Sequence, residues 1–226
     1  MDYKTTLVAI ATALGLSAGI AQATTVEFAS PGWTYNNPGA NEQVDWRVSV
    51  NDDTAGILSF DVSIDAGSSA TGDILGFAFD LADAGLTQSD ISNFTSSTGE
   101  GITGFFTDST SCGNGGCNWN GATSDDFDYI LRVGAQGSAN GSITSLSFDL
   151  DVSDTFMLST STLTRVGIRS QSLGAAPNGG GGSSKDINTV PNELVATTPI
   201  PLPAGAWLLL TAMGGLGVAR LRKRSA

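Results

Sequence analysis

The chain has 226 residues, with 10 basic and 22 acidic side chains and no histidine, so its formal net charge is −12. Without histidine, Ser-His-Asp and Cys-His catalysis and His-based zinc sites are excluded. The acidic balance disfavours nucleic-acid binding, because basic patches recognise phosphate backbones. A hydrolytic enzyme would therefore need paired carboxylates, as glycosidases do.

The first 23 residues have the features of a signal peptide. Lys4 precedes an apolar stretch at residues 7–20, and Ala21 and Ala23 flank Gln22 in the small-x-small form of a signal-peptidase site. We expect cleavage after Ala23; the alternative is an uncleaved N-terminal anchor. Residues 24–172 are then expected to form one folded domain.

The residue pattern of this domain is typical of β-strands. Residues 58–65 alternate apolar and polar side chains, which is the period of a strand buried on one face. Residues 146–152 repeat the pattern and place Asp149 and Asp151 together on the solvent face. The predicted strands are Val26–Ala29, Val44–Val50, Ile57–Asp65, Ile74–Asp80, Ile102–Phe106, Phe127–Val133, Ile143–Val152 and Arg165–Gln171.

Short strands at regular spacing, with turn residues between them, predict an all-β fold: an antiparallel, jelly-roll-like β-sandwich. Two segments compete for helix, Ala82–Ile91 and Asp154–Leu163, the second with Asp154 as a candidate N-cap. Asp52 and Asp53 precede Gly56 and predict a hairpin turn.

The two cysteines, Cys112 and Cys117, flank a short loop of glycine and asparagine. Two thiolates cannot complete a tetrahedral zinc site, and the spacing is not the Cys-x-x-Cys of redox proteins. In an exported chain we expect a disulfide between them; two free thiols are the alternative.

Asp125, Asp126 and Asp128 follow this loop and offer oxygen ligands of the kind that calcium prefers. The spacing is not that of an EF-hand, so a hydrated loop entering a strand is the alternative. The cleft of a glycan-active enzyme usually also shows aromatic platforms, and the sequence does not bring the aromatic residues of the domain together. These are Trp33, Tyr35, Trp46, Trp119 and Tyr129.

Residues 173–199 contain four consecutive glycines and three prolines, and predict a loop or spacer. Residues 200–226 then combine a proline motif, an apolar run and a cationic end. The run of 16 residues from Ala204 would form a hydrophobic helix of about 24 Å, a marginal membrane span. The cations favour the cytoplasmic side. The motif is Ile200, Pro201, Leu202, Pro203 and Ala204, and the cations are Arg220, Arg222, Lys223 and Arg224.

The tail resembles a PEP-CTERM sorting signal of the variety whose motif reads Val-Pro-Leu-Pro-Ala, with Ile200 in place of the valine. The resemblance implies a Gram-negative bacterium in which exosortase recognises the prolines and processes the tail. An ordinary C-terminal anchor is the alternative. More loosely, residues 72–77, 127–128, 143–150 and 182–185 are similar to cargo domains that such tails carry. That likeness implies class and location, and no catalytic residue.

These features predict a non-enzymatic protein that is exported across the inner membrane and acts at the cell surface or in the extracellular matrix. The expected partners are signal peptidase, exosortase, the membrane through the tail helix before processing, and exopolysaccharide. No cofactor is expected apart from calcium. The alternatives are a calcium- or polysaccharide-binding module of a biofilm matrix, and a glycan-active enzyme with paired carboxylates.

Overall fold

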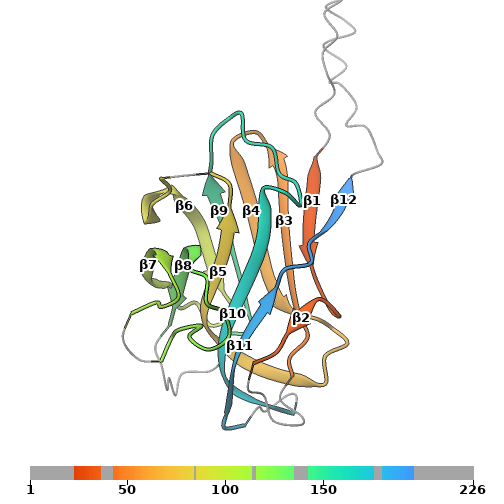
Figure 1. Ribbon diagram of the computed structural model, residues 1–226, viewed down its shortest axis with the longest axis vertical. Coiled ribbons are helices and arrows are strands. Elements are labelled where there is room, and N and C mark those ends of the chain that lie inside the picture. Colours follow the sequence, from red (N-terminus) through yellow and green to blue (C-terminus); the bar gives the residue numbers. More distant parts are fainter. Residues whose placement is uncertain are drawn as a thin grey trace, which may run out of the picture. The chain divides into compact units, whose positions relative to one another are not determined.

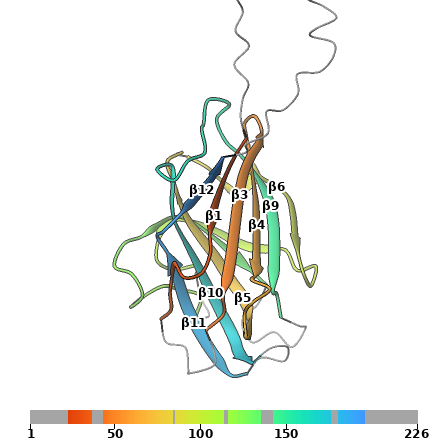
Figure 2. The same cartoon turned by 90° about the vertical axis from the view of Figure 1, so that its right-hand side faces the viewer.

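The computed structural model describes residues 23–36, 43–83, 85–113, 116–134, 142–175 and 180–195. These residues form two six-stranded antiparallel sheets that pack face to face (Figures 1 and 2). The all-β sandwich is thereby confirmed. Each of the eight predicted strands is present, with boundaries shifted by a few residues.

The first sheet, here sheet A, contains in spatial order β12 (Asn192–Val195), β1 (Thr24–Phe28), β3 (Trp46–Thr54), β4 (Ile57–Ile64), β9 (Ser145–Asp151) and β6 (Ile91–Ser96). The second, sheet B, contains β2 (Trp33–Thr34), β11 (Gly182–Asn188), β10 (Leu163–Ala175), β5 (Ala70–Leu81), β8 (Phe127–Val133) and β7 (Ile102–Ser109). The predicted hairpin joins β3 to β4, and Gly56 takes the positive φ of 75° that its turn requires.

The core lies between the sheets and is centred on phenylalanines. Phe60 of β4 and Phe148 of β9 stack with their ring centroids 4.6 Å apart. Phe77 and Phe79 of β5 meet Phe60 from the opposite sheet, at 6.1 and 5.1 Å. Offset and edge contacts of this kind add to the hydrophobic burial that holds the layers together.

A second, smaller core lies on the outer face of sheet B. The loop between β7 and β8 crosses this face and buries seven residues there: Ala78, Cys112, Cys117, Trp119, Phe127, Ile130 and Ile187. Two glycines let the loop approach, because a Cβ on Gly76 would lie 2.8 Å from Cys117 Sγ and one on Gly167 would lie 2.7 Å from the Phe127 ring. The central strands of sheet B, β5, β8 and the middle of β10, are therefore buried on both faces.

Little helix is present, and neither of the two segments that compete for helix forms an α-helix in the described residues. Ala82–Ile91 contains only the 3-10 turn η1 (Gln88–Asp90), and Ile91 already begins β6. Asp154–Leu163 forms turns, in which Ser159 N–H donates to Thr162 Oγ1 (2.8 Å) and the Thr162 hydroxyl donates to the Met157 carbonyl (3.0 Å). Hydroxyl side chains that bond locally to the backbone compete with helix formation, which explains why the second segment is not helical.

The predicted spacer at residues 173–199 is also wrong for most of its length. Strand β10 continues to Ala175, β11 pairs with β10, and β12 pairs with β1. On β11, the polar residues Ser184, Asp186 and Asn188 are buried at alternate positions, whereas Ile187 is buried in the second core. This inverted polarity hides a strand from a pattern search, which expects apolar residues inside.

Candidate functional site

The first and last strands of the folded unit lie side by side at one edge of sheet A (Figures 1 and 2). They pair antiparallel with Thr24 opposite Val195 and Thr25 opposite Leu194. Because the pairing is antiparallel, the start of β1 and the end of β12 occupy the same corner of the sandwich. We call Thr24, Val195 and the side chain that holds Thr24, Asp52, the terminal corner.

The terminal corner is held by polar contacts from other parts of the chain. The Thr24 N–H donates to Asp52 Oδ1 of β3 at 2.6 Å. Thr160 N–H, in the loop that follows β9, donates to Glu193 Oε2 of β12 at 3.5 Å. The first and last strands of the folded unit are therefore attached to the rest of the sandwich by more than their pairing with each other.

Of the residues predicted for processing, only Ala23 falls within the described part of the chain. It is half-buried and directly precedes β1. Ala21 lies outside the described residues, as do the whole motif Ile200, Pro201, Leu202, Pro203 and Ala204 and the cations Arg220, Arg222, Lys223 and Arg224. Within the described residues no helix is long and apolar enough to cross a membrane, and the apolar run 204–219 lies beyond them.

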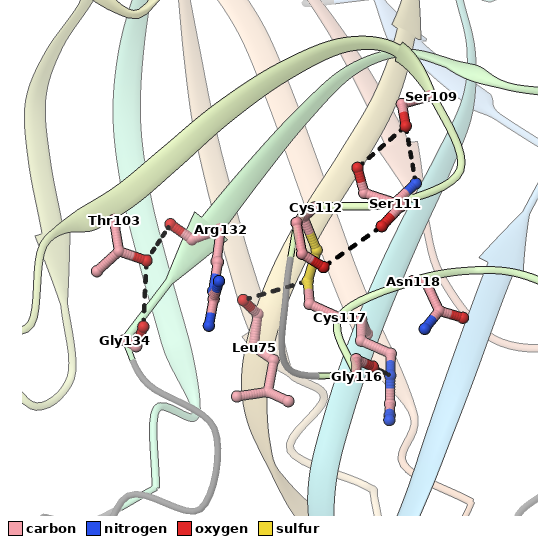
Figure 3. Close-up of a disulfide and its surroundings, with 12 residues drawn as sticks. Leu75, Thr103, Ser109, Ser111, Cys112, Gly116, Cys117, Asn118, Arg132 and Gly134 are labelled. Carbon is pink, nitrogen blue, oxygen red and sulfur yellow. Dashed lines mark hydrogen bonds between the residues drawn. A yellow bond between two sulfur atoms is a disulfide. The ribbon is translucent and has the colours of Figure 1, made fainter.

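The predicted disulfide is present between Cys112 and Cys117 (Figure 3). Both sulfurs are buried against the outer face of sheet B, and Cys112 N–H donates to the Cys117 carbonyl at 3.0 Å. Arg169 of β10 anchors the loop from the sheet side, since its Nε donates to the Gly116 carbonyl at 2.9 Å. Burial lowers the pKa of Arg169.

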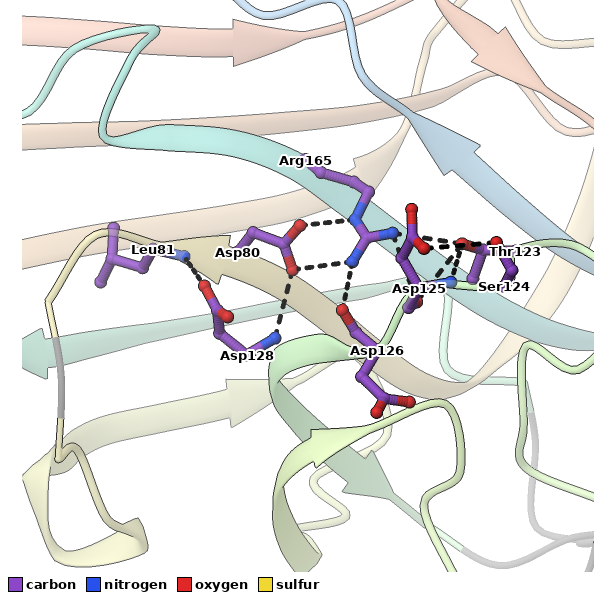
Figure 4. Close-up of polar contacts among 8 residues, drawn as sticks. All are labelled: Asp80, Leu81, Thr123, Ser124, Asp125, Asp126, Asp128 and Arg165. Atoms are coloured by element: carbon purple, nitrogen blue, oxygen red, sulfur yellow. Dashed lines mark hydrogen bonds and ion pairs between the residues drawn. The ribbon is translucent and has the colours of Figure 1, made fainter.

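The three aspartates predicted to bind calcium do not converge (Figure 4). Asp125 and Asp126 are exposed, and their backbone carbonyls, not their carboxylates, accept hydrogen bonds from Arg165. The Asp128 carboxylate accepts the N–H of Leu81 at 3.0 Å. Among the described residues no group of three or more acidic or cysteine side chains could hold a metal ion, and calcium binding remains a prediction.

A cation of the protein itself occupies this region. The Arg165 guanidinium forms a two-point ion pair with Asp80, at 2.5 and 3.1 Å, and its Cζ lies 4.1 Å above the centre of the Phe127 ring. The paired hydrogen bonds and the ring contact together fix the orientation of the guanidinium plane. A lysine ammonium group could not make both contacts in this way. Burial, and then the charge of Asp80, raise the pKa of Asp128. The cluster joins β5, β8 and β10.

A buried carboxylate that the sequence analysis did not single out lies between the sheets. Asp186 of β11 is fully buried; it accepts a hydrogen bond from Trp46 Nε1 of sheet A at 2.9 Å and another from the Ser184 hydroxyl. Burial raises the pKa of Asp186 to about 6. Burial and the nearby Asp45 likewise raise the pKa of Tyr35 to about 12. The alternation of polar residues at positions 184, 186 and 188 is the sequence signal that could have indicated the buried Asp186.

The aromatic residues considered for a glycan platform lie mainly in the interior. Trp33, Trp46, Trp119 and Tyr129 are buried, and Tyr35 is half-buried. Tyr129 Oη donates to the Asp83 carbonyl at 2.6 Å, and Trp33 Nε1 donates to the Trp46 carbonyl at 2.7 Å. These five rings therefore serve the cores of the sandwich and do not form an exposed platform.

No family model, curated protein or solved structure matches the chain.

Proposed function

We propose that this protein is a non-enzymatic surface or matrix component that is exported and then sorted through its C-terminal tail by an exosortase-type enzyme. Signal peptidase would cut after Ala23, and the processing enzyme would recognise Pro201, Leu202 and Pro203. The apolar run would retain the chain in the membrane before processing, and Arg220, Arg222, Lys223 and Arg224 would orient it. The folded body would then be released to the surface or the extracellular matrix.

The observation that carries this proposal is the pairing of β1 with β12. The two segments with targeting features flank one folded unit, whose ends lie at the same corner. Both segments with targeting features therefore connect to the sandwich at the same corner, which supports a body that is attached to one membrane.

The position of β12 also fixes the length of the tether. Only eight residues, 196–203, separate Val195 from the apolar run. Fully extended, they reach roughly 28 Å at about 3.5 Å per residue. The body would therefore sit close to the membrane while the tail is attached, and the terminal corner would face the processing enzyme.

The test compares the intact mass of the protein from the medium or outer surface of cells with that of P201A/P203A. We expect the wild-type chain to begin at Thr24 and to lack the apolar run, and the double variant to keep its tail and stay in the membrane. P199A removes a nearby proline outside the motif and should be processed like the wild type. Retention of residues 207–226 in all three proteins would show an ordinary anchor and refute the proposal.

A further inference from the structure

The outer face of sheet A carries two unbroken polar rows. The first runs across five strands through Thr25, Asn51, Ser59, Asp149 and Ser92, which are consecutive partners in the sheet register. The second runs through Glu27, Ser49, Asp61, Ser147 and Thr95 in the same way. The rows are two residues apart, roughly 7 Å, and each spans roughly 19 Å across strands about 4.8 Å apart.

Hydrogen bonds order the side chains of the rows. Asp149 accepts hydrogen bonds from Ser59 Oγ and Asn93 Nδ2, both at 2.7 Å. The hydroxyls of Thr95 and Ser147 lie 2.8 Å apart. A surface whose polar groups are already ordered loses less conformational entropy when it binds a partner. The bonds from Asn93 and Ser59 also lower the pKa of Asp149, so this carboxylate stays charged in mildly acidic solution.

The two polar rows carry negative charge only. They contain three carboxylates, Glu27, Asp61 and Asp149, and no cation. Arg47 lies beside the second row on the same face of β3, and its ion pair with Glu27 at 2.7 Å offsets the charge of that carboxylate. The other basic residues of the sandwich, Arg132, Arg165, Arg169 and Lys185, all lie on strands of sheet B. The face therefore repels polyanions and anionic lipid and complements a cationic partner.

The chemistry of the rows narrows the partner further. Their members are hydroxyl, amide and carboxylate side chains, and no apolar or aromatic residue interrupts them. Protein partners are usually anchored by buried aromatic and aliphatic side chains, for which these rows offer no complement. A polymer that presents hydroxyls and ammonium groups along an extended chain can instead bond to the rows throughout their length.

From this register and charge we infer that the outer face of sheet A binds a polysaccharide that carries primary amines. The hydroxyls and Asn51 would bond to the sugar hydroxyls, and Asp61 and Asp149 would pair with the ammonium groups. The inference deepens the proposed surface role and rests on it only for the place where the protein meets the polymer. Binding and tail processing are measured separately, so one can fail without the other.

The experiment titrates the purified full-length chain, in detergent, with a fully deacetylated chitosan oligosaccharide by calorimetry. We expect binding that weakens at high salt and that the N-acetylated oligosaccharide of equal length does not show. D61N/D149N should weaken binding at least tenfold. The matched control, D125N/D126N, removes two exposed carboxylates away from the rows and should change affinity less than twofold.

A further variant covers the case in which loss of Asp149 disturbs the fold. S49K places a cation within the second row and leaves the bonds to Asp149 intact, and it should weaken binding as strongly as D61N/D149N. Equal losses in the row variant and the control would overturn the location. Equal affinity for oligolysine of matched charge, or for the N-acetylated sugar, would overturn the assignment of the partner.

Discussion

The outer faces of the two sheets differ in what covers them. On sheet A, no loop covers the polar rows, and the central strands β3, β4 and β9 alternate between core and solvent. On sheet B, the disulfide-closed loop buries the face, and ten of the twelve residues of β5 are buried. The difference teaches that a sandwich can leave one face open to solvent when the other face supplies a second core.

The largest effect is expected from overpacking beneath the loop of sheet B. A Cβ at position 167 would lie 2.7 Å from the Phe127 ring and 2.8 Å from Trp119 Nε1. We therefore expect G167V to lower the free energy of unfolding by about 3 kcal/mol, measured by urea denaturation. S49V, on the bare face, should stay within about 0.5 kcal/mol of the wild type. Equal losses would show that the two faces are not different in packing.

A smaller effect is expected from opening the loop itself. C112A/C117A removes a cross-link between residues five positions apart. Loop-closure entropy for so short a ring amounts to about 2 kcal/mol, which we expect as the loss in free energy of unfolding. Wild-type protein unfolded in the presence of a thiol reductant should approach the variant. A variant as stable as the oxidised wild type would show that the second core holds the loop without the bond.

The smallest effect contrasts two aspartates, one inside the sandwich and one on the bare face. Because the pKa of Asp186 is raised to about 6, the folded state binds its proton more tightly than the unfolded chain does, and stability rises as the pH falls through 6. From pH 7 to pH 5 this gain is about 1 kcal/mol.

Urea denaturation at the two pH values measures the gain. D186N should lose it. D149N should keep it, because the lowered pKa of Asp149 confines its own contribution to the range below about pH 4. If D186N retained the full pH dependence, the raised pKa would belong to another group.

Much of sheet A could be predicted from the sequence because its central strands bury alternate residues on one face. Strand β6 was missed because its apolar residues, Ile91 and Phe94, are three residues apart in the sequence. That spacing resembles a helix. A bulge between Ser92 and Thr95, with Asn93 at a positive φ of 50°, lets both pack against the core. Strand β11 was missed because polar residues point inward and are satisfied by partners far away in sequence, such as Trp46.

The candidate site was predictable only where it is local. Cys112 and Cys117 are close in sequence, and their bond was expected. The pairing of Thr24 with Val195 joins the two ends of the domain, and the ion pair of Arg165 with Asp80 spans 85 residues. Such contacts depend on how the strands are ordered in the sheets, which no short stretch of sequence determines.

The hydrogen bond from Thr24 N–H to Asp52 would become an ion pair in a chain cut after Ala23. The cut would turn this amide into an α-ammonium group, so a neutral donor 2.6 Å from a carboxylate would become a charged one. Aminopeptidases need a free, extended N-terminus, whereas this one would be held in an ion pair and a sheet. The processed protein would thus carry its own protection against trimming from the new end.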